Sequence, residues 1–475
     1  MTNADRPLDK ILDNRHHIHL IGIGGSGMYP LAQILHKKGF LLTGSDNNRT
    51  ETLDAVESLG IRVFMGQAAE NIAGADLIVY SAAIMADNPE LVAAKASGVP
   101  VLERSELLGL VTSWYSDAVC ISGTHGKTTA TSMLTQIFLE EGVDLSCVIG
   151  GKLPSIGGSG RAGTSDVMVC EACEFVDTFL HLFPDVSVIL NIDADHLDYF
   201  KTLDNIIRSF RKFAENASKA IVYNGDDENT KKAVAGITGK EFVTFGFGAD
   251  NDICAKIVTV DGLRTDFDLI TDGEAHRLSI YVPGKHNVLN AAAAAACARY
   301  CGVSWNGIAL GLQVFRGAIR RFQKIAEVRG VTIVDDYAHH PAEIAATLTA
   351  AKQDEATRVW AVFQPFTYSR TELLLDNFAE ALGIADRVVL TDIMGSREKN
   401  LNHTYTRVLG EKIPGAVWFD APDAVVDEQS AARKEENFTE IAQYLAANVA
   451  PGDLVITMGC GDVYKLAKKL AGMLA

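Results

Sequence analysis

The sequence predicts an α/β fold built from three domains. Two glycine-rich loops are the first evidence, because each stands between a short apolar run typical of a buried strand and a helix-like run. The second is length, since 475 residues exceed what one hydrophobic core usually holds. The third is the alternation of apolar strands and helices that continues to the C-terminus. We expect domains at residues 1–115, 116–321 and 322–475.

The N-terminal domain begins with an expected strand at His17–Ile23, a glycine loop at Gly22–Met28 and a helix at Tyr29–Lys38. The loop has the G-x-G-x-x-G spacing of a Rossmann-like domain, in which the first glycine permits the turn and the second admits a phosphate. Asp46 ends the next strand, where an acid can bond a ribose hydroxyl. The pattern alone would indicate NAD, but the same amides can hold any diphosphate, including that of a UDP-sugar.

The central domain begins with an expected strand at Ala118–Ser122, then the loop Gly123–Gly126, Lys127, Thr128 and a helix. This order suits a nucleoside triphosphate, because loop amides and the helix N-terminus face phosphate oxygens. Lys127 can reach the terminal phosphates, and the Thr128 hydroxyl can ligate Mg²⁺. The match is incomplete, since Ile121 stands where the P-loop pattern has its first glycine. An ordinary strand-to-helix turn is the alternative, but a central P-loop ATPase-type domain explains Gly-Lys-Thr-Thr better.

Polar residues follow two further strands of the central domain. Glu174 comes after the expected strand Val167–Glu171, and His196 follows the next apolar run. Because ligands bind at the carboxyl edge of a parallel sheet, both are candidate site residues, although either alone could be a solvated loop residue. Asn287 and Asn290 open an alanine-rich helix, where an Asn amide can read an adenine edge or simply cap the helix.

The C-terminal domain has the strand and helix alternation of a second Rossmann-like fold. Expected strands at Val331–Val334 and Arg358–Phe363 run into the polar loops DDYAHHP and QPFTYSR. The adjacent His339 and His340 could form a polar turn, but in a loop after a strand they are also good ligands for an anion or a carboxylate.

Composition excludes several classes of partner. The net charge is −17 and no basic run interrupts it, so neither nucleic acid nor an anionic membrane is expected to bind. The N-terminus lacks the apolar core of a signal peptide, and no apolar run approaches the roughly 20 residues of a membrane span.

Eight cysteines are present, and Cys170-x-x-Cys173 has no second pair with metal-ligand spacing. We therefore expect free thiols in a reducing, cytoplasmic compartment.

Seven segments together carry a resemblance to a known family. They are GIGGSGM, GTHGKTT, EACE, NIDADHLD, PGKHNVLNA, RRF and DDYAHHP. With them the chain resembles the Mur ligases over nearly its whole length, and most closely the members that join L-alanine to UDP-N-acetylmuramic acid. The resemblance implies a cytoplasmic enzyme of peptidoglycan synthesis that uses ATP with Mg²⁺ or Mn²⁺. We expect a monomer or a weak homodimer.

The resemblance also implies roles for individual residues. Catalytic roles fall to Lys127, Glu174, His196, Arg320 and His339. The metal would be held by Thr128, Glu174 and His196. ATP would contact Gly123, Thr124, His125, Gly126, Lys127, Thr128, Thr129, Asn287, Asn290 and Arg321, with either Arg320 or Arg321 reaching the phosphates. The UDP-sugar would contact Gly22, Gly24, Gly25, Ser26, Gly27, Met28, Asp46 and Ser81. The incoming amino acid would meet Tyr337, His339 and Arg370.

The implied reaction is ATP-dependent ligation through an acyl phosphate, releasing ADP and phosphate. Three alternatives remain: a tripeptide ligase of murein recycling, a UDP-sugar-binding regulator without catalysis, and an NAD-dependent oxidoreductase that would leave Gly126–Thr128 unexplained. Gln67, Phe366 and Thr367 depart from the family pattern, and Ala342 replaces a threonine. We expect these changes to affect the sugar and amino-acid pockets rather than the ATP site.

Overall fold

The computed structural model describes the chain except for residues 1–10, 13–14, 353–355, 396–397, 399 and 421–427. It contains three β-sheets, and the chain falls into two compact units. The first unit comprises residues 1–258, 266–279 and 286–315, and the second comprises residues 259–265, 280–285 and 316–475. The three-domain α/β fold is confirmed, whereas the expected domain boundaries stay predictions.

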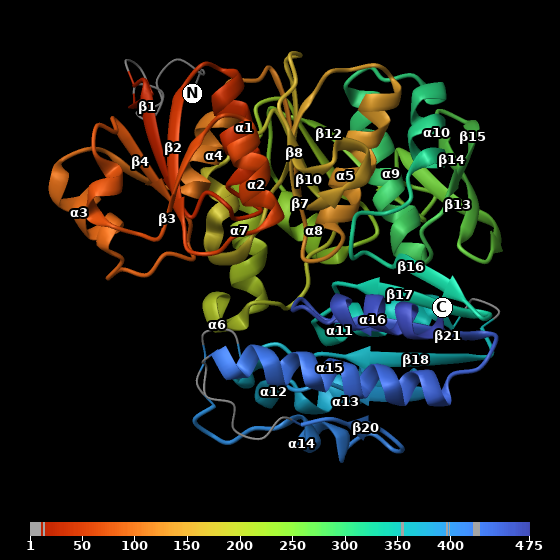
Figure 1. The fold of residues 1–475 in the computed structure, drawn as a ribbon. Coiled ribbons are helices and arrows are strands. Elements are labelled where there is room, and N and C mark those ends of the chain that lie inside the picture. The colour runs from red at the N-terminus through yellow and green to blue at the C-terminus, as the bar shows by residue number, and fades with distance from the viewer. Residues whose placement is uncertain (1–10, 13–14, 353–355, 396–397, 399, 421–427) are drawn as a thin grey trace. The chain divides into compact units, whose positions relative to one another are not determined.

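The first sheet is parallel, with strand order β3-β2-β1-β4-β5. Its strands are β1 (His17–Ile21), β2 (Leu41–Asp46), β3 (Arg62–Met65), β4 (Leu77–Tyr80) and β5 (Val101–Glu103). Its helices are α1 (Tyr29–Lys37), α2 (Glu51–Ser58), η2 (Ala69–Ile72), α3 (Pro89–Ser97) and α4 (Arg104–Thr112). Ile18 and Leu20 pack with the helices of one face, while Ile21 packs toward α3 on the other face (Figure 1). Because β1 lies between β2 and β4, the glycine loop after β1 stands at the point where the strand order reverses.

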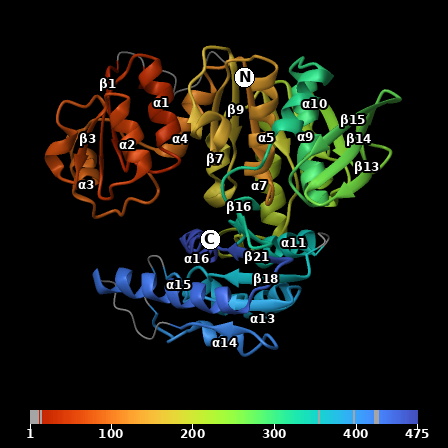
Figure 2. The same cartoon turned by 45° about the vertical axis from the view of Figure 1, so that its right-hand side comes forward.

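The second sheet has ten strands in the order β15-β14-β13-β12-β11-β10-β6-β9-β7-β8. They are β6 (Asp117–Ser122), β7 (Ser146–Leu153), β8 (Gly158–Arg161), β9 (Val167–Glu171), β10 (Val186–Ile189), β11 (Ala220–Asn224), β12 (Glu241–Gly246), β13 (Ile253–Asp261), β14 (Arg264–Thr271) and β15 (Glu274–Ile280). Figure 2 shows β13, β14 and β15 as a ribbon that extends from one edge. The parallel strands β9 and β10 flank β6, so the loops after all three meet at one sheet edge.

The central domain also contains helices, several of which pack against the second sheet. They are α5 (Lys127–Glu140), η3 (Pro154–Ile156), η4 (Phe175–His181), α6 (Leu197–Phe200), α7 (Leu203–Glu215), α8 (Glu228–Val234), α9 (Lys285–Tyr300) and α10 (Trp305–Val314). The alanine run Ala291–Ala296 of α9 is buried, so this part of the helix is closely packed. Small side chains there let the helix approach its neighbours closely.

The third sheet lies in the second unit, with strand order β16-β17-β21-β18-β19-β20. Its strands are β16 (Gln323–Val328), β17 (Val331–Asp336), β18 (Arg358–Phe363), β19 (Arg387–Leu390), β20 (Val417–Trp418) and β21 (Asp453–Met458). The helices are α11 (Pro341–Ala351), α12 (Tyr368–Leu373), α13 (Leu375–Leu382), α14 (Thr406–Gly410), α15 (Glu428–Asn448) and α16 (Tyr464–Leu474). One core contains residues of α11 and α13, and the other contains residues of α15 and α16, so helices cover both faces.

Two expected element boundaries shift in ways that matter for the site. The strand expected at Val331–Val334 continues through Asp336, so Asp335 and Asp336 are buried strand residues and not part of a loop. The strand expected at His17–Ile23 ends at Ile21, two residues earlier, so the glycine loop follows the strand directly. Within the described residues, no helix is long and apolar enough to span a bilayer.

Two glycines in helix interiors predict opposite effects of the same substitution. At Gly109 in α4, an added Cβ would lie 2.1 Å from the backbone oxygen of His181, whereas at Gly472 in α16 it would meet nothing within 4 Å. We expect Gly109→Ala to lower the free energy of unfolding by about 1 to 3 kcal/mol through overpacking. We expect Gly472→Ala to raise it by up to about 1 kcal/mol through helix propensity. Urea unfolding followed by circular dichroism measures both, and equal effects of the two variants would contradict this packing.

Candidate active site

The loop between β6 and α5 is held from the side by the segment that follows β10. The amide of Thr124 donates to the carbonyl oxygen of Asn191 at 3.1 Å, and the amide of Asp193 donates to Thr124 Oγ1 at 2.9 Å. The amide of His125 donates to Asn191 Oδ1 at 2.8 Å. These bonds fix the shape of the loop, and the expected contacts of Thr124 and His125 with ATP stay predictions.

Asn287 and Asn290 brace this loop from α9. Gly126 has a φ of 85°, and a Cβ there would lie 2.4 Å from Asn290 Oδ1. Asn290 Nδ2 donates to Asn287 Oδ1 at 3.1 Å, and both residues are buried. Gly126 is thus required by its conformation and by the close approach of Asn290. The expected contact of these amides with adenine stays a prediction.

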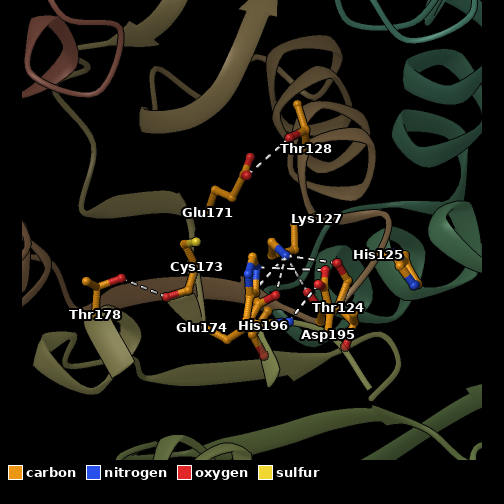
Figure 3. Close-up of polar contacts among 12 residues, drawn as sticks. Thr124, His125, Lys127, Thr128, Glu171, Cys173, Glu174, Thr178, Asp195 and His196 are labelled. Carbon is orange, nitrogen blue, oxygen red and sulfur yellow. Dashed lines mark hydrogen bonds and ion pairs between the residues drawn. The ribbon is translucent and has the colours of Figure 1, made fainter. Parts of the chain in front are cut away.

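Lys127 is the first residue of α5, and its ammonium group is buried in polar contacts (Figure 3). Nζ donates to the carbonyl oxygens of Gly123 at 2.6 Å and Thr124 at 3.1 Å, and it lies 2.8 Å from Glu174 Oε2. Burial is the largest single effect and lowers the pKa of Lys127, but the charge and hydrogen bond of Glu174, together with the nearby Cys173 and Glu171, outweigh it and raise that pKa above its ordinary value. The lysine is held as a cation at the mouth of the phosphate loop, as transfer of a phosphoryl group requires.

Thr128 pairs with a carboxylate that the sequence reasoning left without a role. Its hydroxyl donates to Glu171 Oε1 at 3.1 Å, and the amide of Gly150 donates to Glu171 Oε2 at 2.7 Å. Glu174, the expected metal ligand, instead contacts Lys127 (Figure 3). Glu171 is the last residue of β9 and lies opposite Ile121 of β6, a position at the carboxyl edge that could have indicated it.

The oxygens of Thr128 and Glu171 suit a hard cation such as Mg²⁺. No three His, Cys, Asp or Glu side chains converge as a metal site in the described part of the chain. Mg²⁺ commonly keeps several waters and binds substrate phosphates beside one or two protein oxygens. The pair fits that mode of binding.

His196 lies on a strained segment after β10. It has a φ of 52°, and its ring centroid is 4.8 Å from that of Phe175. Its Nε2 lies 3.8 Å from a carboxylate oxygen of Asp195. Val176 also has a positive φ, 54°, which is costly for a β-branched residue and is characteristic of functional segments. The expected role of His196 as a metal ligand stays a prediction.

The carboxylate of Asp46 helps to hold the glycine loop that follows β1. Gly22 has a φ of 80°, which confirms the expected turn. The amide of Gly24 donates to Asp46 Oδ2 at 3.0 Å, so this carboxylate holds the glycine loop. The expected bond of Asp46 to a ribose hydroxyl stays a prediction. Gly25 donates its amide to the carbonyl oxygen of Gly22 at 3.1 Å. Met28 is only 1% exposed and packs in the core, so its side chain is unavailable to the expected UDP-sugar.

In the first domain, Ser81 lies next to the glycine loop, whereas Gln67 contacts the start of α3. Ser81 follows β4, and its Oγ lies 3.4 Å from where a Cβ of Gly22 would be, next to the glycine loop as expected. Gln67, which departs from the family pattern, accepts a hydrogen bond from the side chain of Asn88, which also caps α3. The glutamine is therefore part of the helix support.

In the second unit the structure separates two neighbouring arginines. Arg320 Nε donates to the buried Asp335 at 2.9 Å, and its Nη1 donates to the carbonyl oxygen of Gly461 at 2.7 Å. Its Nη2 donates to the carbonyl oxygen of Gly459. These bonds hold Arg320 against the segment after β21, and its expected catalytic role stays a prediction. Arg320 and Arg321 both lie over the ring of Tyr337, 5.1 and 5.2 Å from its centroid, and which of them reaches the phosphates also stays a prediction.

The residues expected around the amino acid gather after β17 and β18. The rings of Tyr337 and His339 are 5.4 Å apart at 78°, and His339 Nδ1 lies 3.3 Å from Glu343 Oε2. Burial lowers the pKa of His339, and the charge of Arg370 lowers it further, against the opposing effect of Glu343. Phe366 pairs through its backbone with Met394, shortly before helix α12, which carries Arg370. The cluster offers a cation, a phenol and an imidazole to a carboxylate.

Three family models match consecutive parts of the chain. They are "Mur ligase family, catalytic domain" at residues 17–115, "Mur ligase middle domain" at 121–298, and "Mur ligase, glutamate ligase domain" at 320–461. A UDP-N-acetylmuramate–L-alanine ligase of Agathobacter rectalis is 43% identical over 459 residues, which are 96% of this chain and 97% of that protein. The chain belongs to the Mur ligase family.

Other Mur ligases agree with this assignment. A UDP-N-acetylmuramate–L-alanine ligase of Acetivibrio thermocellus is 41% identical over 95% of each chain. The crystal structure of the UDP-N-acetylmuramate–alanine ligase of Thermotoga maritima superimposes with a TM-score of 0.78 at 26% identity, covering 96% of this chain and 98% of that chain. A murein peptide ligase of Psychrobacter arcticus shares the fold, with a TM-score of 0.70 at 23% identity over 97% and 98% of the two chains. The chain is accordingly an ATP-dependent ligase.

The buried pair of Lys127 and Glu174 predicts separable effects on catalysis and stability. We expect Lys127→Met to reduce phosphate release at least about 100-fold, because one donor to developing charge is lost. It should also destabilise the fold by about 3 to 5 kcal/mol, since Glu174 is left buried and uncompensated. The double variant Lys127→Met/Glu174→Gln should recover stability without recovering turnover.

The matched control for this experiment is Lys152→Met. Lys152 belongs to the same domain, but its side chain is 43% exposed and pairs with a Glu51 side chain that is 90% exposed. This variant should retain both activity and stability, because exposed pairs contribute little. Turnover by Lys127→Met within threefold of the wild type would contradict the assignment.

Proposed function

We propose that this Mur ligase joins L-alanine to the lactyl carboxylate of UDP-N-acetylmuramic acid in peptidoglycan precursor synthesis. The observation that carries the proposal is its similarity to UDP-N-acetylmuramate–L-alanine ligases over almost the whole chain, together with the phosphate loop built around Lys127. ATP, UDP-N-acetylmuramic acid and L-alanine are the proposed substrates. A cytoplasmic location agrees with those substrates.

The chemistry requires activation of a carboxylate, because an amine does not displace oxide from it. The substrate carboxylate attacks the γ-phosphorus of ATP, ADP leaves, and an acyl phosphate forms. Charge spreads over the transferring phosphoryl group, so the protein supplies mainly position and positive charge. The ammonium of Lys127, fixed by two loop carbonyls, is the cation that the first unit provides. The amine of L-alanine then attacks the acyl carbon, and phosphate leaves with its bonding electrons.

Thr128 and Glu171 would hold the cation that accompanies ATP. Their oxygens are 3.1 Å apart. Thr128 belongs to α5, and Glu171 is the last residue of β9, a strand of the second sheet. When bound there, Mg²⁺ neutralises phosphate charge. Glu174 would keep Lys127 charged and oriented, a role different from the metal ligation first expected of it.

Tyr337, His339 and Arg370 would bind the carboxylate of the amino acid. The planar guanidinium of Arg370 can form two parallel hydrogen bonds with a carboxylate. Burial lowers the pKa of His339, so the imidazole stays neutral to a lower pH than a free histidine does. A neutral imidazole can donate or accept one hydrogen bond without adding charge. Arg321, above the Tyr337 ring, would contact phosphate oxygens.

The role of Glu171 predicts a change in the dependence on metal. We expect excess EDTA to abolish activity, and Thr128→Val and Glu171→Gln to raise the Mg²⁺ concentration for half-maximal rate by about tenfold or more. Glu174→Gln should lower kcat without that shift, and Lys152→Met is again the control. Full activity in excess chelator, or a shift seen only with Glu174→Gln, would assign the metal differently.

The amine pocket predicts selectivity for L-alanine over peptides. We expect glycine to be a poor but detectable substrate, because it lacks one methyl group worth about 1 to 3 kcal/mol. The measurement is kcat/KM for L-alanine, glycine, L-serine and an L-Ala-D-Glu-containing tripeptide with the same UDP-sugar. A tripeptide that outperforms L-alanine would establish the murein-recycling activity instead.

A further inference from the structure

A carboxylate, that of Glu90 on α3, is fully buried in the interior of the first domain. Its ion-pair partner is the equally buried His19, whose Nε2 lies 3.7 Å from Glu90 Oε2. Burial is the largest single effect and raises the pKa of Glu90, but His19, Ser45 and Asn71 together outweigh it and lower that pKa below its ordinary value. The carboxylate is therefore ionised within the core of the domain.

Hydrogen-bond donors reach both oxygens of Glu90 from different parts of the domain. The hydroxyl of Ser45, near the end of β2, donates to Oε2. The side chain of Asn71 donates to Oε1, and the amide of Ala68 donates to the same oxygen at 3.4 Å. Glu90 thus connects α3 with the end of β2 on one side and with the segment after β3 on the other.

The packing of α3 does not by itself explain a charge at this position. The helix already contributes Leu91 and Ala94 to an apolar cluster with Ile21 and Ile78 of the sheet. A buried carboxylate loses its hydration, and apolar residues of similar volume often replace buried ion pairs without loss of stability. The groups that Glu90 fixes in place therefore account for it better than its burial does.

Ser45 connects this carboxylate with the glycine loop after β1. Its hydroxyl is held by Glu90, and its carbonyl oxygen accepts hydrogen bonds from the amides of Gly22 at 2.8 Å and Ile23 at 3.1 Å. The preceding Gly44 permits this close approach, because a Cβ there would lie 2.7 Å from side-chain atoms of Ile23. The first two residues of the loop therefore rest on a backbone oxygen whose own side chain Glu90 fixes.

We propose that Glu90 is a positioning residue, which holds the glycine loop through Ser45 in the conformation that binds the sugar nucleotide. The inference rests on the proposed function and adds to it a residue that, being fully buried, acts without touching the substrate. Because the end of β2 is fixed from the interior, the loop amides keep their direction before a ligand arrives. Preorganisation of this kind increases affinity, since less freedom is lost on binding.

Two variants remove the bond between Glu90 and Ser45 from opposite ends. Ser45→Ala deletes the hydroxyl, and Glu90→Leu replaces the carboxylate by an apolar side chain. We expect each to weaken calorimetric binding of UDP-N-acetylmuramic acid by about tenfold, as loss of one hydrogen bond to a charged group implies. In steady state, KM for the UDP-sugar should rise, whereas kcat and KM for ATP should change little. The double variant should lose about as much affinity as either single variant, because both remove the same bond.

Two further variants separate positioning from general stability. Glu90→Gln keeps a hydrogen-bonding group beside the Ser45 hydroxyl, which can donate or accept, so this variant should recover part of the affinity. The control is Asn71→Ala, which removes a partner of Glu90 Oε1 and leaves the bond to Ser45 in place. Asn71→Ala should lower the urea concentration at the unfolding midpoint, with affinity for the UDP-sugar within twofold of the wild type.

Affinity of Ser45→Ala within twofold of the wild type would overturn the proposal. An equal loss in Asn71→Ala would also overturn it, and so would losses of the two single variants that multiply in the double variant. Circular dichroism verifies that each variant is folded, and Ser45→Ala decides the question alone if Glu90→Leu does not fold. A wild-type enzyme that binds no UDP-N-acetylmuramic acid would overturn the proposed function itself, and this inference with it.

Discussion

The site depends on the compensation of one buried positive charge. Lys127 stands at the start of α5, where the helix dipole disfavours a cation, and its ammonium is largely removed from water. Two carbonyl oxygens of its own loop and the carboxylate of Glu174 offset that cost. The lysine therefore remains charged and fixed in place before a nucleotide arrives, which reduces the reorganisation needed when a phosphoryl group begins to move.

Other features of the first unit follow from the need to hold this loop. Asn290 fills the space that a side chain at Gly126 would need, and the segment after β10 supplies hydrogen bonds to Thr124 and His125. The parallel neighbours β9 and β10 deliver Glu171 and His196 to the same edge. The two carboxylates of the EACE segment thus have separate partners, one the hydroxyl of Thr128 and the other the ammonium of Lys127. This separation would let one segment serve both the proposed metal binding and the charge of the lysine.

The second unit shows the same division between support and chemistry. Arg320 binds Asp335 and the carbonyl oxygens after β21, so it organises the sheet edge that carries Tyr337. Arg321 and Arg370 keep their guanidinium groups near the loop that contains His339. Arg320 and Arg321 look equivalent in sequence and lie over the same Tyr337 ring, but the hydrogen bonds to Asp335 and to the segment after β21 come from Arg320.

The sequence by itself determined the α/β class, the two glycine loops and the strands β9 and β18, because glycine conformation and apolar runs are local properties. It also determined Lys127 and Thr128 as the centre of the site, since both stand within one short segment. Only the tertiary structure showed that Thr128 pairs with Glu171, whereas Glu174 contacts Lys127. It also showed that Arg320 binds Asp335 and that the carboxylate of Asp46 accepts from the Gly24 amide. These partners lie far apart along the chain, so only folding brings them together.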